Sequence, residues 1–215
     1  MNRFSTLFFG IFLTFASSWL GIVVAPYLQL GKLQPVRDEI TGEVYPPQLT
    51  GSAIRGRKVY AANGCVYCHT QQVRGPTRLL KEGTLPPDIA RGWGTRRTYP
   101  RDYLGEKPHF LGTMRTGPDL SNVGLRYTAD WQHRHLYAPA AISKGSTMPP
   151  FRYLYKKQRI VGAPTPDALD FSQIPGVAPP EEGYEIVPTQ EARDLVAYLL
   201  SLKRSAYELP EATDR

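Results

Sequence analysis

The segment that most constrains this chain is Cys65-Val66-Tyr67-Cys68-His69, which has the form C-x-x-C-H. This is the pattern for covalent attachment of a c-type haem. Two thiols on one turn can each add to a vinyl group of the same haem, and the adjacent imidazole then lies beneath the iron as the proximal ligand. Because the chain has only two cysteines, the pattern predicts one covalently attached haem c and a fold built around it.

Two other interpretations of these cysteines remain open from the sequence alone. A thioredoxin-like redox pair follows a strand in a βαβ unit, whereas the stretch 54–63 before Cys65 reads as a helix. A structural zinc site needs four ligands at recognised spacings, and His133-x-His135 does not have the usual H-x3–5-H form. We therefore favour haem over thiol redox chemistry and zinc.

The N-terminus carries a long apolar run. Phe4 to Val24 contains no charged side chain and is long enough to cross the hydrocarbon core of a bilayer as a helix. A cleavable signal peptide has a shorter apolar core, so we expect an uncleaved anchor, with cleavage as the alternative. The positive charge of Arg3 and the amino terminus favours a cytoplasmic N-terminus and places the large remainder of the chain on the outer side.

Polar and proline-rich stretches divide the rest of the chain into segments. Prolines in the polar stretch after residue 30 resist regular structure, and six prolines between Gly162 and Pro188 mark a surface excursion. The predicted organisation is a transmembrane anchor at 1–30, a linker at 31–50, a mono-haem cytochrome c domain at 51–205 with the loop excursion 162–188, and a C-terminal tail at 206–215.

Capping residues and apolar spacing predict the helices of the domain. We expect one helix over 53–63, capped by Ser52 and ended by Gly64, and a second over 128–137, capped by Thr128. A third runs over 190–203, capped by Thr189, because Ala192, Leu195, Leu199 and Leu202 form one apolar stripe. The Gly-, Pro- and Arg-rich stretch 75–118 reads as a long ordered loop around the haem. The predicted fold class is mainly α, a single transmembrane helix followed by a class I cytochrome c-like domain with long loop insertions.

The net charge is +7, and much of the excess lies between Arg91 and Arg115. We expect no nucleic-acid partner for this chain, because it has the features of a membrane-anchored haem protein. Most of these arginines read as a solvated basic face, and some are candidates to pair with haem propionates or an acidic partner surface.

Five side chains are candidates for the sixth iron ligand. They are Met114, Met148, His109, His133 and His135. We favour Met148, because the prolines after it hold an extended loop that presents the sulfur, whereas Met114 reads as core packing. The Pro118 carbonyl is placed to accept the Nδ1–H of His69 and fix its tautomer. An iron with both His69 and Met148 has no vacant position, so no substrate chemistry is expected on this chain alone.

The other histidines and aromatic residues are weaker candidates. His133 and His135 lie two positions apart on one short helix and point apart, which favours surface or hydrogen-bonded roles. Trp93, Tyr99 and Tyr127 either line the haem and bind its propionates or pack as ordinary aromatic residues.

The ordered motifs resemble one family. The segments Gly56–Arg74, Arg115–Tyr127 and Asp130–Leu136, followed by Met148-Pro149 and the closing Leu-Val-Ala-Tyr-Leu-Leu-Ser-Leu stretch (195–202), are similar to the mono-haem cytochrome c subunit (subunit II) of cbb3-type cytochrome c oxidases. The resemblance implies that His69 and Met148 are the axial ligands. We also expect the other candidate residues to contribute to haem binding: Cys65, Cys68, Pro118, Arg115, Arg126 and Tyr127. It also implies that Gly56 and Tyr60 on the first helix cross the final helix near Tyr198.

The same resemblance implies a function. Such a subunit passes electrons to the haem–copper catalytic subunit, which reduces oxygen to water, and assembles with that subunit and another cytochrome c subunit. It implies the bacterial inner membrane, with one span and a periplasmic haem domain. The sequence departs from the family at Gly75, where proline is common, and over Phe151–Pro188. Two alternatives remain open: the cytochrome c subunit of a nitric oxide reductase, and a haem-based gas-sensing module.

Overall fold

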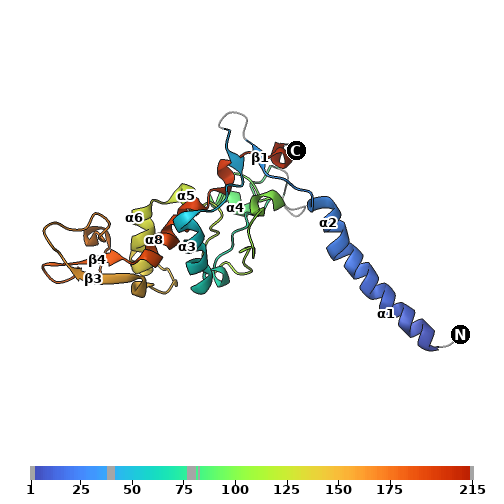
Figure 1. The fold of residues 1–215 in the computed structure, drawn as a ribbon, viewed down its shortest axis with the longest axis horizontal. Helices are drawn as coiled ribbons and strands as arrows, with labels where there is room; N and C mark the ends of the chain where they lie inside the picture. The colour runs from blue at the N-terminus through green and yellow to red at the C-terminus, as the bar shows by residue number, and fades with distance from the viewer. Residues whose placement is uncertain (1–2, 38–41, 77–80, 82, 214–215) are drawn as a thin grey trace. The chain divides into compact units, whose positions relative to one another are not determined.

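The computed structural model describes residues 3–37, 42–76, 81 and 83–213. Parts of the predicted anchor (1–2), linker (38–41), loop (77–80 and 82) and tail (214–215) lie outside the described residues. The chain forms two compact units, one containing the N-terminal segment through Pro46 together with Pro100–Gly105, and the other containing the rest. The mainly α fold class is confirmed: the structure consists of helices, short turns and two small sheets (Figure 1).

The first unit begins with one continuous helix, made of α1 (Arg3–Trp19), η1 (Leu20–Val24) and α2 (Ala25–Leu30) (Figure 1). In η1 the backbone turn widens, and the amide of Ala25 donates to the carbonyl of Leu20, five residues back. The wide turn lies directly before Pro26, which has no amide hydrogen to continue the regular pattern. A proline inside an apolar helix is thereby accommodated without ending it.

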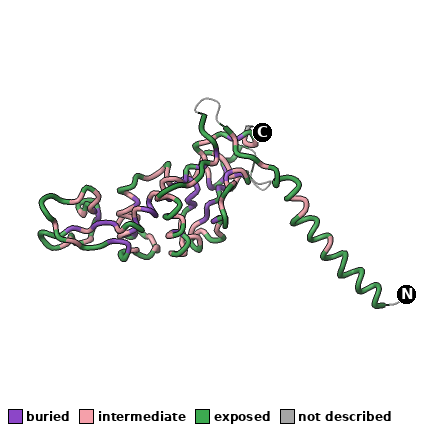
Figure 2. Tube along the Cα trace, in the orientation of Figure 1, coloured by how far each residue is buried: buried purple, intermediate pink, exposed green. Residues whose placement is uncertain are grey.

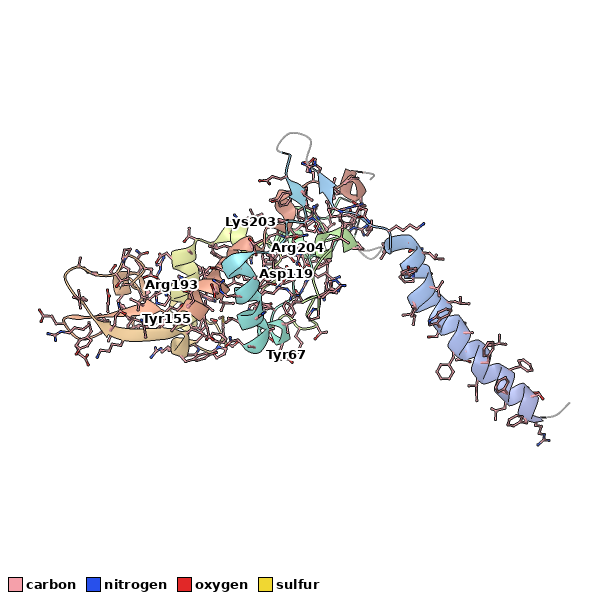
Figure 3. All side chains as sticks on the ribbon, in the orientation of Figure 1. Tyr67, Asp119, Tyr155, Arg193, Lys203 and Arg204 are labelled. Atoms are coloured by element: carbon pink, nitrogen blue, oxygen red, sulfur yellow. The ribbon has the colours of Figure 1, made fainter. Side chains whose placement is uncertain are left out.

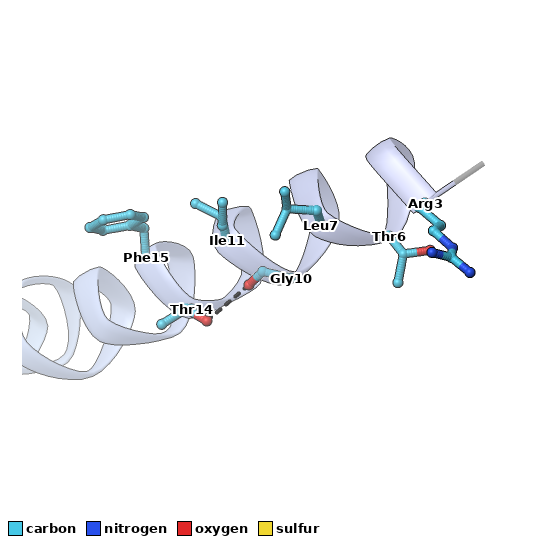
Figure 4. Close-up of a pocket in the computed structure, with 7 residues that line it drawn as sticks. All are labelled: Arg3, Thr6, Leu7, Gly10, Ile11, Thr14 and Phe15. Carbon is cyan, nitrogen blue, oxygen red and sulfur yellow. Dashed lines mark hydrogen bonds between the residues drawn. The ribbon is translucent and has the colours of Figure 1, made fainter. Parts of the chain in front are cut away.

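The helix Arg3–Leu30 has 28 residues and is long and apolar enough to cross a membrane. Its side chains are almost all exposed (Figure 2). A shallow hollow on one face is lined by Arg3, Thr6, Leu7, Gly10, Ile11, Thr14 and Phe15 (Figure 4). Within it, the hydroxyl of Thr14 donates to the carbonyl of Gly10 at 2.9 Å, which satisfies the hydroxyl inside the helix itself.

A small sheet follows the apolar helix. Strands β1 (Val36–Arg37) and β2 (Val44–Tyr45) pair antiparallel. The buried hydroxyl of Tyr45 donates to the carboxylate of Asp102 on η3 (Pro100–Tyr103), which ties the sheet to the returning segment of the same unit.

The second unit is organised by the crossing of α3 (Gly51–Ala62) and α8 (Gln190–Ser201) (Figure 1). At Gly56 the backbones come so close that a Cβ atom there would lie 1.7 Å from the carbonyl oxygen of Asp194. Beside it the rings of Tyr60 and Tyr198 pack edge to face, with centroids 5.3 Å apart. The expected crossing of Gly56 and Tyr60 with the final helix is confirmed.

The helix caps explain where the main helices begin. Thr189 accepts the amide of Ala192 at the start of α8, and Thr128 accepts the amide of Trp131 at the start of α6 (Ala129–Tyr137), as predicted. The predicted cap of α3 is wrong: the N-cap residue is Thr50, and the hydroxyl of Ser52 instead accepts a hydrogen bond from Arg55. The apolar stripe of Ala192, Leu195, Leu199 and Leu202 is buried as expected.

Residues 155–188, which include the predicted loop excursion 162–188, contain a hairpin that the sequence analysis did not predict. Strand β3 (Tyr155–Arg159) pairs antiparallel with β4 (Tyr184–Pro188), in the register Tyr155↔Pro188. The loop between them returns to the domain, because Leu169 is buried and donates its amide to the carbonyl of Ile186. The remaining short elements are η2 (Cys65–Tyr67), α4 (Pro87–Ala90), α5 (Val123–Arg126), α7 (Pro139–Ile142), η4 (Arg152–Leu154), η5 (Phe171–Gln173), η6 (Arg204–Ala206) and α9 (Pro210–Thr213).

Candidate haem site

The two thiols lie on a single tight turn. Gly64, with φ of 66°, takes the left-handed conformation that ends α3, and η2 follows at once. The amides of Cys68 and His69 both donate to the carbonyl of Cys65, at 3.2 and 3.0 Å. Cys65 is half-buried, and burial raises the pKa of its thiol to about 11. Cys68 is exposed, and both thiols are free, as two attachment points for one ligand have to be.

His69 is held in one orientation by the turn at Gly117 and Pro118. Its Nδ1 lies 2.7 Å from the carbonyl oxygen of Pro118, and because a carbonyl only accepts, Nδ1 carries the proton. Gly117 donates its amide to the carbonyl of Cys68 at 2.9 Å, and a Cβ on Gly117 would lie 2.2 Å from Cε1 of His69. Burial lowers the pKa of His69. The ring is therefore neutral and clamped, with Nε2 available to a metal.

A buried polar network joins the residues that follow His69 to those that follow Pro118. The carboxylate of Asp119 accepts from the Thr70 hydroxyl at 2.5 Å and the Gln72 amide at 2.7 Å. The guanidinium of Arg115 donates to Thr70 Oγ1, to the carboxylate of Asp88 and to the carbonyl of Gln72, at 2.9, 2.6 and 2.6 Å. Asp119 lies inside the domain (Figure 3). All three Arg115 nitrogens thus bind protein acceptors, which indicates a role in fixing the loop.

Arg126 is placed differently. One terminal nitrogen donates to the carbonyl of Asp119 at 2.9 Å, and its guanidinium lies over the ring of Tyr127, 5.4 Å from the centroid. Burial lowers the pKa of Arg126. Its buried Nε has no hydrogen-bond partner among the described residues, and a buried cationic donor without an acceptor is costly. An anionic group bound here would supply the acceptor.

Met148 lies on the apolar side of the site. It is half-buried and packs against the main core cluster, as do Cys65, Val66, Tyr127 and Phe151. Its backbone amide donates to the hydroxyl of Ser146 at 3.2 Å. The thiol of Cys65 and the thioether of Met148 therefore belong to side chains that pack against the same core cluster. The core packing predicted for Met114 is wrong, because that side chain is 59% exposed.

The model of one family matches most of the chain. It describes the cytochrome C oxidase mono-heme subunit, FixO, and covers residues 6–194. The chain belongs to the FixO family. This confirms the resemblance inferred from the ordered motifs, and it identifies the chain as a mono-haem subunit of a cytochrome c oxidase. Comparison with curated proteins gave no match.

The residues present fit the haem that the FixO family implies. A neutral imidazole, a thioether, two thiols on one turn and an apolar wall are the groups that a six-coordinate c-type haem requires. The unpartnered Nε of Arg126 also suits a carboxylate at the edge of the site. The fit thus rests on side chains from three separate segments, at 65–69, at Arg126 and at Met148.

The basic segment of this FixO member is only partly a solvated face. Arg91 is exposed, but Arg96 is half-buried and donates to the carbonyls of Tyr207, Arg97 and Arg204. Trp93 lies between two cations, with the guanidinium carbons of Arg91 and Arg115 each 5.2 Å from its ring centroid. Tyr99 is buried, with the Arg97 guanidinium 4.4 Å from its ring.

The remaining histidines differ from one another. His109 is exposed. His133 Nδ1 lies 3.2 Å from the hydroxyl of Tyr155, and burial lowers the pKa of His133. Burial is the largest cause that lowers the pKa of His135 to about 4, and repulsion from His69 when that ring is protonated adds to it, so His135 is neutral near pH 7. The hydrogen-bonded roles expected for His133 and His135 agree with these contacts.

Sequence reasoning missed several residues that shape the site. Asp119, Thr70 and Asp88 were not singled out, because their partners come from distant segments. Trp131 was also missed, although its spacing of four from His135 on the predicted helix indicates one helical face.

Proposed function

We propose that this chain is a membrane-anchored cytochrome that carries one covalently attached haem c and passes electrons to the haem–copper catalytic subunit of a cbb3-type oxidase. The observation that carries the proposal is the clamp on His69, whose Nδ1 lies 2.7 Å from the Pro118 carbonyl beside two free thiols. When bound, the haem supplies a one-electron couple at a six-coordinate iron. The oxygen chemistry then belongs to the partner subunit.

Each site residue has a role in this proposal. Cys65 and Cys68 would hold the haem through thioether links, and His69 and Met148 would supply the two protein ligands of its iron. Pro118 fixes the tautomer of His69, and the Arg115 contacts hold the loop that carries it. Arg126 binds a propionate through its free Nε, and Tyr127 lines the same edge.

The helix Arg3–Leu30 supports a single membrane span. With Arg3 at its short end, the positive-inside rule orients the haem domain to the periplasmic side of a bacterial inner membrane. The anchor at 1–30, linker at 31–50, haem domain at 51–205 and tail at 206–215 complete the proposal. The partners are the catalytic subunit and another cytochrome c subunit.

The first test is to solubilise membranes in mild detergent and capture the chain by a C-terminal tag. A haem stain that survives a denaturing gel, and that disappears in the Cys65→Ala, Cys68→Ala double variant, supports covalent attachment. Co-purification of a haem–copper subunit with oxygen-reducing activity supports the electron-carrier role. Co-purification with a nitric oxide reductase, or recovery of the chain alone, contradicts the named complex.

The second test is Met148→Leu. Leucine has no sulfur, so the iron loses its sixth ligand, and we expect a lower reduction potential and new carbon monoxide binding by the reduced protein. Potentiometric titration and carbon monoxide difference spectra measure these changes. Met114→Leu is the matched control, because Met114 is exposed, and it should leave both properties unchanged. An unchanged potential in Met148→Leu refutes the ligand assignment, and carbon monoxide binding by the unaltered protein supports the gas-sensing alternative.

A further inference from the structure

Three aromatic rings form a stack along α6. The rings of Tyr127 and Trp131 lie 3.6 Å apart between centroids with planes 9° apart, and those of Trp131 and His135 lie 4.6 Å apart with planes 11° apart. Trp131 and His135 lie four positions apart on one face of α6, and Tyr127, the C-cap residue of α5 in extended backbone, continues the stack before α6 begins. We refer to Tyr127, Trp131 and His135 as the ring stack.

The ring stack is linked to the loop that carries Met148. At its end, Nδ1 of His135 lies 3.5 Å from the hydroxyl of Ser143, the C-cap residue of α7. The carbonyl of Ser143 accepts the amide of Ser146 at 3.0 Å, and the hydroxyl of Ser146 accepts the amide of Met148 at 3.2 Å. Ring stacking, one side-chain contact of 3.5 Å and two hydrogen bonds thus connect Tyr127 to the backbone of Met148.

The other end of this loop returns to the same place on α6. The amide of Phe151 donates to the carbonyl of Leu136 at 2.8 Å. The loop 143–151 is therefore tied to two consecutive residues of the helix, through the side chain of His135 at one end and the backbone of Leu136 at the other. Between these ties Lys144, Gly145, Thr147, Pro149 and Pro150 are exposed. A loop with so few buried contacts depends on its end points for its position.

We propose that the ring stack, acting through Ser143 and Ser146, is a positioning device that holds Met148 where its sulfur coordinates the iron. The inference rests on the proposed function, because it requires Met148 to be an axial ligand. His135 is the main positioning residue. Stacking on Trp131 fixes the plane of its ring, and its Nδ1 contacts the hydroxyl of Ser143. Its effect on electron transfer is indirect, through the strength of the methionine–iron bond, which sets the haem potential.

His133 provides a matched control on the same helix. It lies two positions before His135 but faces Tyr155 of β3, with ring planes 87° apart and Nδ1 3.2 Å from the hydroxyl. Its removal alters packing against the hairpin without touching the ring stack. A general loosening of α6 would affect both histidine variants, whereas the positioning role affects only His135.

The experiment compares His135→Leu, Trp131→Leu, Ser143→Ala and His133→Leu in the full-length chain purified in detergent. The readouts are the methionine–iron charge-transfer band of the oxidised protein and the rate of carbon monoxide binding by the reduced protein. Loss of one hydrogen bond weakens an equilibrium by about threefold to tenfold, so we expect faster carbon monoxide binding by that factor and a weaker band in His135→Leu and Ser143→Ala. Trp131→Leu removes the stacking partner of His135 and should change both signals in the same direction. His135→Gln, which keeps a side-chain donor and acceptor, should restore much of both signals.

Equal behaviour of His135→Leu, Ser143→Ala and His133→Leu overturns the inference. If His135→Leu does not fold, Ser143→Ala decides the matter, because it removes only a half-buried hydroxyl. The proposed function fails separately: Met148→Leu without a gain in carbon monoxide binding removes the ligand assignment. A gain in Met148→Leu with none in His135→Leu or Ser143→Ala leaves the ligand in place and refutes the ring stack as its support.

Discussion

Alanine at position 56 tests the closest helix contact in the domain. The added methyl carbon would lie 1.7 Å from the carbonyl oxygen of Asp194, 2.3 Å from its carbonyl carbon and 2.9 Å from the amide nitrogen of Leu195. All three atoms belong to the backbone of α8, so no side-chain rotation relieves the overlap. The two helices must move apart by about 1.5 Å, and a gap of only roughly 0.5–1 Å already forfeits a quarter to a half of a dispersion contact.

The cost follows from what the helices share. Separation loosens the packing of Tyr60 on Tyr198, both of which are fully buried. Overpacking typically costs about 1–3 kcal/mol or more, and a backbone clash belongs at the upper end. The better helix propensity of alanine returns about 1 kcal/mol. A net loss of about 2–3 kcal/mol lowers the melting temperature of a chain of this size by roughly 5–10 °C.

The assay is thermal unfolding of the detergent-solubilised chain, followed by far-ultraviolet circular dichroism. Gly10→Ala is the matched control, because Gly10 is also helical and a Cβ there would meet no atom within 4 Å. Because alanine also has the better helix propensity at position 10, we expect the control to melt no lower than the unaltered protein. A Gly56→Ala variant that melts within about 1 °C of the unaltered protein would refute the close crossing, since that shift corresponds to well under 1 kcal/mol.

Two further predictions concern α8. Thr189→Ala removes the hydroxyl that accepts the amide of Ala192, the third residue of the helix, so the free energy of unfolding should fall by about 1 kcal/mol in urea titrations. Thr189→Ser should recover most of it, and an equal loss in both variants would contradict the capping role. A hydrogen bond from Arg55, the largest cause, holds the pKa of Asp194 below its usual range. The ion pair therefore stabilises the fold above the unfolded pKa of about 3.9 and loses its effect as the pH falls through the lower folded value. The difference in melting temperature between the unaltered protein and Asp194→Asn should shrink across that window, and a difference independent of pH would exclude the carboxylate as its source.

The elements predicted well from sequence are those fixed by local signals. The helix α8 was predicted because Thr189 caps it and its apolar residues repeat every three or four positions. The hairpin was missed for the opposite reason. Strand β3 reads Tyr-Lys-Lys-Gln-Arg without apolar alternation, and its partner at Tyr184 follows a proline-rich stretch. Strand pairing across such a distance leaves no local pattern.

The residues of the candidate site also differ in whether a local sequence pattern predicts them. The spacing of Cys65, Cys68 and His69 is local, and the contact of His69 with Pro118 followed from recognising a turn. The different hydrogen bonding of Arg115 and Arg126 could not be predicted from the sequence, because it depends on which acceptors the fold brings to each guanidinium. Arg115 reaches Asp88 across 27 positions, whereas the Nε of Arg126 meets no acceptor among the described residues.

The crossing of α3 and α8 also fixes the order in which the domain can be assembled. Arg55 and Asp194, which meet beside it, are 139 positions apart in the chain. Such a non-local contact is slow to form, and it cannot form until α8 has been synthesised. The thiols of Cys65 and Cys68 follow α3 directly, so they remain on an open chain for as long as α8 is missing. Under the proposed function, the thiols would therefore be accessible for haem attachment only during the interval, set by chain growth, before the core closes.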